Sequence, residues 1–357
     1  MRLQLYITKQ VLSAFTFAVA ALLFVALPGI VVSAVHKLPN VAPALLLHYL
    51  PIVLEGLAPY LLPVCFMLAV TGVYGRLASD REWIAIQMSG LNPLRCFVPG
   101  LVLALLLSAG TFWMLSEELP KLKEREKRFL IGAAASVIEN LQPGRTSISL
   151  GDFYLKAADR DEQTGTFFDA YIRVPEGESL QGDVFASTVD IRIQGSHLYA
   201  HLTDLEIFDP RGGVSARLGE AELEFDLADR VSQAPRDSHK PRYRTSGEIL
   251  SALRAGTVDP EYRRDYALEF HRRTALSLSY VLFLGLGAPT GILLRRGTRL
   301  GALAVATVYG LLYHVFSTQI GSELGKARSL AVWIGPWVTT FIGLAVSLVL
   351  VRRAIRR

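Results

Sequence analysis

The feature that most constrains this chain is a set of six long runs without a charged side chain. They are Val11–Val35, Leu57–Tyr74, Cys96–Ser116, Thr274–Leu294, Leu300–Ser322 and Leu330–Val351. Each run reaches or approaches the roughly 20 residues with which an α-helix crosses the hydrocarbon of a bilayer. Because lipid offers the backbone no hydrogen-bond partner, the runs predict six transmembrane helices, and the second is expected to begin near Pro51. The first run exceeds the roughly 7–15 apolar residues of a signal peptide, so we expect a retained helix.

The composition agrees with a membrane protein and excludes several other classes. Hydrophobic residues make up 51% of the chain and charged residues 19%, whereas an average soluble domain has about a quarter charged residues. Two cysteines cannot form a disulfide framework. A net charge of +5 would suggest nucleic acid in a soluble protein. Here the basic residues flank the apolar runs, so they predict membrane topology and no nucleic-acid partner.

Lysine and arginine also predict the orientation, because cytoplasmic loops are enriched in them. They gather before the first run, after the second and fourth runs, and at the C-terminus: Arg2, Lys9, Arg76, Arg81, Arg95, Arg295, Arg296, Arg299, Arg352, Arg353, Arg356 and Arg357. The short loops after the first and fifth runs are poorer in them. Both termini are therefore expected in the cytoplasm, and residues 117–273 on the outer side.

The outer segment is expected to have a β-rich centre. Residues 117–130 and 245–272 have helical character, and Thr245 with Glu248 fits a capping box. Between them lie runs of alternating polarity separated by turn residues: Phe153–Lys156, Phe167–Val174, Val184–Ile193, Leu198–Phe208 and Ala221–Leu227. These strands predict a β-jellyroll or sandwich at about 144–230. The expected fold is an α-helical integral membrane protein with six transmembrane helices, in parts 1–116 and 274–357, and an extramembrane β-jellyroll domain inserted between helices 3 and 4.

Residues 77–90, in the expected cytoplasmic loop between the second and third helices, have the composition of a short amphipathic helix. Ser79 or Asp80 can cap its start, Glu82 suits its first turn, and Gly90 can end it. Its apolar residues are too many for a free loop. One interpretation is a helix in the plane of the lipid headgroups. The other is a helix that docks in a groove of a soluble partner, where Glu82 meets a basic residue.

No nucleotide or catalytic site is found in the sequence. The string nearest to a phosphate-binding loop, residues 321–327, has the wrong spacing and no Ser or Thr after Lys326. We expect no catalytic residue, no metal ligand and no bound cofactor in this chain. Any use of ATP is expected in another chain.

Four segments together resemble the lipopolysaccharide-export permease family, LptF and LptG. They are Tyr74–Gly90, Tyr49–Pro63, Leu268–Arg273 with the Gly287–Gly291 string, and Trp333–Arg353. The resemblance implies a permease subunit of an ABC transporter in the inner membrane, with the β-domain in the periplasm. It implies extraction of lipopolysaccharide and its transfer toward the outer membrane. The implied partners are a second LptF/LptG-type permease, a cytoplasmic ATPase dimer that holds ATP and Mg, and a single-helix periplasmic bridge protein like LptC. The sequence does not distinguish an F-type from a G-type member.

The resemblance and the chemistry of the cargo suggest two sets of site residues. Glu82 occupies the family's coupling position for the ATPase, and Arg81, Trp83 and Ile84 accompany it, although Arg81 departs from the small residue more common there. The candidate substrate contacts are Lys37, Arg128, Arg272, Arg273 and Tyr313. Their alternatives are an interfacial anchor for Lys37, a solvated helix face for Arg128 and a structural hydrogen bond in the fifth helix. For the whole chain, the alternatives are a permease for another envelope lipid or lipoprotein, and a scaffold that transports nothing.

Overall fold

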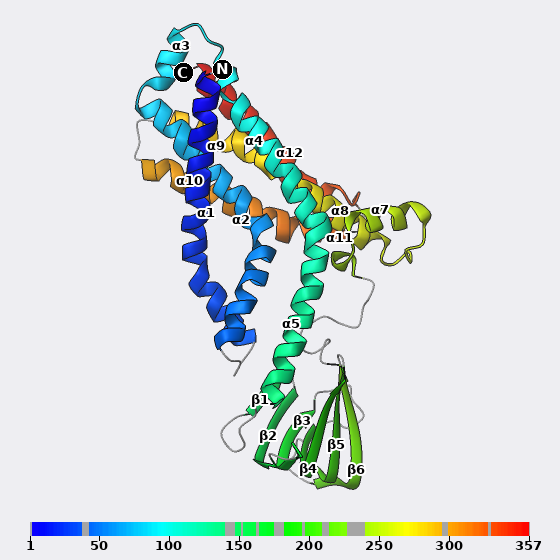
Figure 1. Cartoon of the computed structure of the whole chain (residues 1–357). Helices are drawn as coiled ribbons and strands as arrows, with labels where there is room; N and C mark the ends of the chain where they lie inside the picture. The colour runs from blue at the N-terminus through cyan, green and yellow to red at the C-terminus, as the bar shows by residue number, and fades with distance from the viewer. Residues whose placement is uncertain are drawn as a thin grey trace. The chain divides into compact units, whose positions relative to one another are not determined.

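The computed structural model describes residues 2–37, 43–139, 147–150, 153–161, 164–174, 182–194, 197–208, 214–226, 240–294, 299–327 and 330–356 (Figure 1). The chain divides into two compact units. The first contains Met1–Leu27, Leu54–Leu122 and His239–Arg357, and the second contains Pro28–Val53 and Lys123–Ser238.

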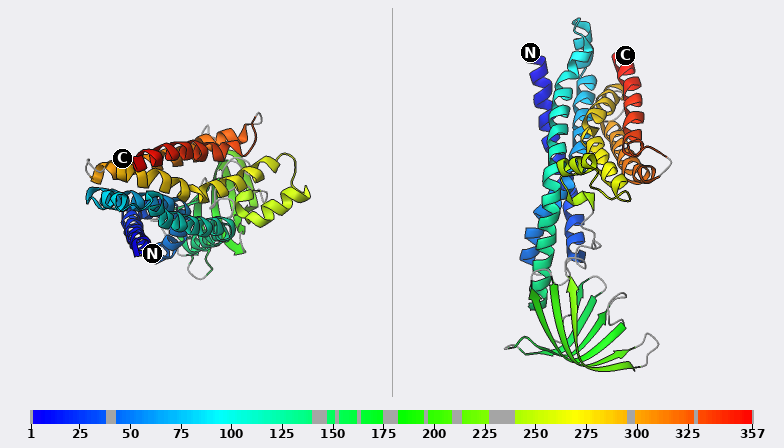
Figure 2. Two further views of the ribbon diagram at one scale, coloured as in Figure 1. Left: turned by 90° about the horizontal axis from the view of Figure 1, so that it is seen from above. Right: turned by 90° about the vertical axis from the view of Figure 1, so that its right-hand side faces the viewer.

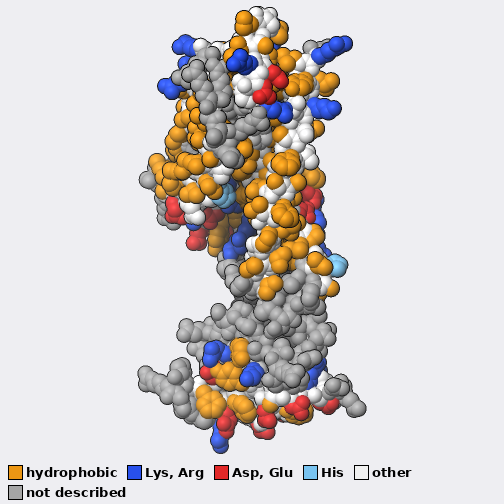
Figure 3. All heavy atoms as spheres, turned by 90° about the vertical axis from the view of Figure 1, so that its left-hand side faces the viewer, with side chains coloured by type: hydrophobic (Ala, Val, Ile, Leu, Met, Phe, Trp, Pro, Cys, Tyr) orange, Lys and Arg blue, Asp and Glu red, His pale blue; other side chains and the backbone are white. Residues whose placement is uncertain are grey.

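In the described part of the chain, six helices are long and apolar enough to cross a membrane, as the charge-free runs predict. The first two spans are single helices, α1 (Arg2–Lys37) and α2 (Pro43–Ser79). The third span consists of α4 (Val98–Trp113), the π-helical turn η2 (Met114–Glu118) and the start of α5 (Leu119–Glu139). The fourth joins α8 (Arg263–Ser277) to α9 (Ser279–Leu293), the fifth joins α10 (Arg299–Val315), the π-helical turn η4 (Phe316–Ile320) and α11 (Gly321–Lys326), and the sixth is α12 (Ile334–Arg356). Figure 3 shows one face of these helices, covered largely by hydrophobic side chains that suit a lipid environment.

Helix α9 lies at the centre of the first unit. Most of its residues are buried, and it packs against α4, α10 and α12. Two glycines four residues apart, Gly287 and Gly291, bring it close to α2. A Cβ atom on Gly291 would collide with the carbonyl oxygen of Thr71 and lie 2.8 Å from the backbone nitrogen of Gly75. Small residues of this spacing allow two membrane helices to pack backbone against backbone.

The described residues of the second unit form one antiparallel sheet of six strands that pair in sequence order, β1-β2-β3-β4-β5-β6. The strands are β1 (Ser147–Leu150), β2 (Phe153–Arg160), β3 (Phe167–Val174), β4 (Gly182–Gln194), β5 (His197–Phe208) and β6 (Val214–Asp226). The inserted β-domain is thus confirmed, and Figure 2 shows its strands fanning out with strong twist. Among the described strands the order is that of a meander, without the crossover that a jellyroll adds. The sequence patterns missed β1 and the first half of β6.

A crease crosses this sheet. In the described strands Ala158, Asp169, Ser187, Asp204 and Gly219 lie opposite one another, yet none of them forms a ladder pair. Two of them are left-handed, Asp169 with φ 47° and Asp204 with φ 49°. Along β3, β4 and β5 alternate residues are buried, and at the crease the buried positions change from even to odd numbers or the reverse. In β5 they are Ala200 and Leu202 before the crease, and Leu205 and Ile207 after it.

The chain enters the fourth span through two short helices of the first unit. A single turn, η3 (Pro241–Tyr243), precedes α7 (Ser246–Ala255). The capping box is confirmed, because the Thr245 hydroxyl accepts from the Glu248 amide at 3.2 Å and the Glu248 carboxylate accepts from the Thr245 amide at 2.8 Å. Gly256 ends α7 in the left-handed conformation, with φ 69°.

Candidate functional site

The segment between α2 and α4 folds into a short helix set at an angle by one left-handed residue. Helix α2 ends at Ser79, Arg81 adopts φ 61°, and α3 then runs over Glu82–Met88. Gly90, with φ 75°, follows its C-cap residue Ser89, as the sequence predicts. The chain continues through the turn η1 (Pro93–Cys96) into α4.

The start of α3 differs from the sequence expectation. Neither Ser79 nor Asp80 caps this helix. The N-cap residue is Arg81, which makes no side-chain cap bond. The Ser79 hydroxyl instead donates to the Arg76 carbonyl at 3.0 Å and to the Asp80 carboxylate at 3.1 Å, within the last turn of α2. The helix proper is therefore shorter than the segment 77–90, because its first residues continue α2.

One face of α3 is fixed to the first unit by buried side chains. Trp83 is fully buried, and its ring meets that of Phe97 edge to face at 5.9 Å. Phe97 in turn stacks on Tyr74, whose hydroxyl donates to the Cys96 carbonyl at 2.6 Å. Ile86, one turn after Trp83, is also buried. The sequence analysis grouped Trp83 with the coupling residues. Its side chain is buried in the first unit and fixes α3 to it.

The opposite face of α3 is exposed. Arg81 and Glu82 begin it, Ala85 continues it, and Met88 is 84% exposed. Two further apolar side chains follow after the helix, Leu91 at 44% and Leu94 at 50% exposure. Ile84 lies at the border, half-buried. The result is a carboxylate next to an apolar surface, which suits either lipid headgroups or a groove in a partner. The sequence analysis did not distinguish these exposed residues from the buried Trp83 and Ile86, although the spacing of 82, 85 and 88 is that of one helix face.

Two of the candidate substrate contacts belong to the second unit. Lys37 is the last residue of α1, and its side chain is outside what the structure describes. Arg128 is exposed on α5, where its Nη2 lies 3.8 Å from Oε1 of Glu124. Near it Glu126 accepts hydrogen bonds from Tyr49 of α2 at 2.9 Å and from Lys123 at 2.6 Å. The basic run on α5 is thus interleaved with carboxylates, as a solvated helix face would be.

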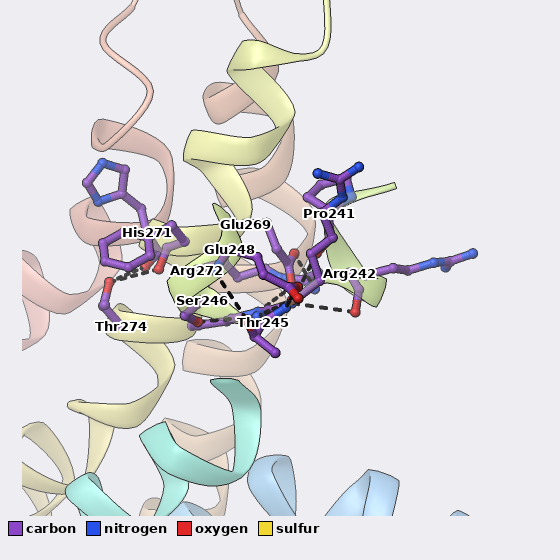
Figure 4. A network of polar contacts seen from close by, with 12 residues as sticks. Pro241, Arg242, Thr245, Ser246, Glu248, Glu269, His271, Arg272 and Thr274 are labelled. Atoms are coloured by element: carbon purple, nitrogen blue, oxygen red, sulfur yellow. Dashed lines mark hydrogen bonds and ion pairs between the residues drawn. The ribbon is translucent and has the colours of Figure 1, made fainter. Parts of the chain in front are cut away.

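Arg272 and Arg273 share one carboxylate but have different environments (Figure 4). Arg273 is buried, and its Nε donates to Glu269 at 3.0 Å. Its remaining donors bind the carbonyls of Pro241, Arg242 and Arg244 and the hydroxyl of Ser246, at 3.0 to 3.5 Å. All the guanidinium nitrogens are therefore engaged within the chain, and the substrate contact of Arg273 stays a prediction. Arg272 binds the other oxygen of Glu269 at 2.8 Å and keeps 43% of its side chain exposed.

Tyr313 also makes its contacts within its own chain. It is buried, its ring meets Phe283 edge to face at 5.1 Å, and its hydroxyl donates to the Ala275 carbonyl at 3.2 Å. This geometry is that of a structural hydrogen bond, and the substrate contact of Tyr313 stays a prediction. Among the described residues no group of His, Cys, Asp and Glu could hold a metal ion.

Residues 5–353, nearly the whole chain, match the family described as "Lipopolysaccharide export system permease LptF/LptG". A search of curated proteins found no match.

Proposed function

We propose a function from one premise: this chain belongs to the LptF/LptG family of lipopolysaccharide export permeases. The family is one of permeases and not of enzymes, and its members form an LptF–LptG pair. Together with the six apolar helices, this membership fits a protein of the inner membrane. The specific proposal is that the chain is the permease half of an ABC transporter that extracts lipopolysaccharide and passes it to a periplasmic bridge protein.

The observation that carries the proposal is the two-faced helix α3. Trp83 and Ile86 attach it to the first unit, while Glu82 and Met88 on its other face are exposed and accessible to a partner. A helix that only rested on the membrane would not need to be tied so firmly to the chain's interior. A helix that receives force from an ATPase would, because the force must reach the membrane spans.

The proposed mechanism follows from what α3 touches. When the partner ATPase dimer binds ATP and Mg and closes, it displaces α3 through Glu82 and the apolar side chains beside it. Trp83 passes the displacement to α2 and α4 through Tyr74 and Phe97. The spans then narrow the space that holds the lipid, which leaves toward the β-domain. The chain itself performs no covalent chemistry and supplies only the binding surface and the moving walls. In this proposal both termini are cytoplasmic and the β-domain is periplasmic.

The test is a charge reversal on the exposed face of α3. Glu82→Arg should abolish co-purification of the ATPase with the full-length permease and leave membrane insertion intact. Glu261→Arg is the matched control, because Glu261 is an exposed carboxylate at the opposite end of the helical unit. It should retain the ATPase. Equal co-purification of the ATPase by Glu82→Arg and wild type would refute the coupling role. Mass spectrometry of the lipid that co-purifies identifies the cargo, and another envelope lipid in place of lipopolysaccharide would refute that part alone.

A further inference from the structure

A cavity of about 470 Å³ lies in the first unit, at the ends of three membrane spans. Its walls come from η3, from the first turns of α8, from η4 with α11, and from the start of α12. The charged residues that line it are Lys240, Arg242, Arg272, Lys326, Asp265 and Glu269. Its volume falls in the range of about 300–1,000 Å³ that is typical of small-molecule sites.

The position of the cavity corresponds to one surface of the membrane. Asp265 and Glu269 stand near the beginning of the fourth span, Lys326 ends the fifth, and the sixth begins at Ile334. The other end of the fourth span, at Ile292, packs in the same cluster as Trp83 of α3. From Glu269 to Ile292 the helical rise amounts to about 35 Å, close to the thickness of the hydrocarbon. The cavity therefore lies at headgroup level, at the end of the unit opposite to α3.

The charges of the cavity leave it positive. Glu269 is already neutralised, because Arg272 and Arg273 bind its two oxygens. Lys240 makes no ion pair within the described part of the chain, and the Arg242 guanidinium lies over the Tyr243 ring at 5.1 Å. Lys326 pairs with the exposed Glu323 at 3.5 Å, and an exposed pair of this kind is weak. With the Arg272–Glu269 pair taken as neutral, three cations, Lys240, Arg242 and Lys326, face the cavity against one carboxylate, Asp265.

We propose that this cavity binds the phosphate-bearing headgroup of an anionic lipid. The inference needs only that the chain spans a membrane, and it does not depend on which cargo is exported. Basic pockets between membrane helices suit anionic headgroups, because their charge complements the phosphate at the depth where the lipid holds it. Lys240, Arg242 and the partly exposed Arg272 approach the phosphate, while Leu268 and Pro336 offer an apolar wall to the first carbons of the lipid. The phosphate can come from a phospholipid of the bilayer or from lipopolysaccharide.

The experiment compares two double variants of the full-length protein that remove the same charge. The double variant Lys240→Gln with Arg242→Gln removes two cations from the lining of the cavity. Arg254→Gln with Arg263→Gln removes two exposed cations outside it. Binding of phosphatidylglycerol, phosphatidylcholine and lipopolysaccharide is titrated by native mass spectrometry. Because each cation near a lipid headgroup contributes about 1 kcal/mol, the cavity variant should bind the anionic lipid about tenfold or more weakly. The control pair should bind it like wild type.

The lipids separate the two sources of phosphate. Weaker binding of phosphatidylglycerol assigns the cavity to a bilayer lipid, and weaker binding of lipopolysaccharide alone assigns it to the cargo. Unchanged binding of both lipids by the cavity variant overturns the proposal, as does an equal loss in the control pair. Both side chains lie outside the Arg273 network, which uses only backbone carbonyls of this segment, so the variant should fold. Lys326→Gln, at the opposite wall, provides a second and independent reading.

Discussion

Replacing Trp83 tests whether packing fixes α3 to the membrane spans. A tryptophan buries roughly 150–250 Å², and at about 25 cal/mol per Å² full burial contributes at most about 4–6 kcal/mol. Against this, the indole Nε1 of Trp83 has no hydrogen-bond partner in the described part of the chain, which costs about 1–3 kcal/mol. Trp83→Ala should therefore destabilise the attachment of α3 by about 3 kcal/mol. Trp83→Phe keeps most of the ring and removes the unpaired N–H, so it should stay within about 1 kcal/mol of wild type.

The chain contains its own probe for this opening. Cys96 is 2% exposed and lies in the same buried cluster as Trp83. In a Cys65→Ser background, the rate at which a small thiol reagent modifies Cys96 measures how often the region around α3 opens. A loss of about 3 kcal/mol corresponds to about 100-fold faster modification when opening is a rapid equilibrium. Met88→Ala, on the exposed face of the same helix, is the control and should leave the rate unchanged.

Two results would refute this reasoning. If Cys96 reacts at the wild-type rate in Trp83→Ala, then α3 is not held by this side chain. If Trp83→Phe reacts as fast as Trp83→Ala, the indole N–H matters more than the packing, and its environment contains a partner that the burial argument overlooks.

Three further predictions concern the rest of the chain. Gly291→Ala should lower the stability of the helical unit by about 1–3 kcal/mol, since its Cβ would meet the α2 backbone; Gly72→Ala, whose Cβ meets nothing within 4 Å, should not, and thermal unfolding in detergent compares them. Asp204→Val should destabilise the sheet by about 1–2 kcal/mol in limited proteolysis, because Asp204 is left-handed, whereas Asp204→Gly should not. A hydrogen bond from Arg173, at 2.9 Å, holds the pKa of Asp183 below its ordinary value. A lowered folded-state pKa gives stability that is present at neutral pH and lost as the pH falls below about 4, so Asp183→Asn should flatten that acid dependence in circular dichroism.

The membrane spans could be predicted because each of them is a long run of residues without a charged side chain. The family could be predicted because four motifs occur in order. The interior of the sheet could not be predicted to the same depth. A strand pattern assumes that inward positions keep one parity, and Leu205 and Ile207 break the parity set by Leu202. The change depends on Asp169 and Asp204 adopting left-handed conformations opposite their neighbours, which only the paired sheet imposes.

The site shows a similar limit. Motif and charge selected Glu82 and Trp83 together, but a helix of seven residues has too few turns for its pattern to distinguish an anchored face from an open one. Arg273 was selected because cations at the end of a membrane span often meet lipid. Besides Glu269 and Ser246, its partners are backbone carbonyls of a segment about thirty residues earlier, and a side-chain pattern does not predict where a carbonyl will point. The role of a cation beside a membrane span therefore cannot be predicted until the position of the segment that packs against it is known.

The packing around α3 limits how a force can spread from it. Trp83 and Ile86 lie in one cluster with residues of α1, α2, α4, α9 and α12, and Gln87 donates to the Ile355 carbonyl at the end of α12 at 3.3 Å. Because a close-packed interior transmits displacement rather than absorbing it, a push on Glu82 cannot move α2 alone. Helix α9 must follow α2, since Gly291 leaves no space for sliding between their backbones. Helix α10 packs against α9, but none of its described side chains belongs to the buried cluster around Trp83. Among the described residues, the fifth span is thus the one that the cluster does not tie directly to α3. In the proposed mechanism, relative motion between this span and the others should change the space that holds the lipid.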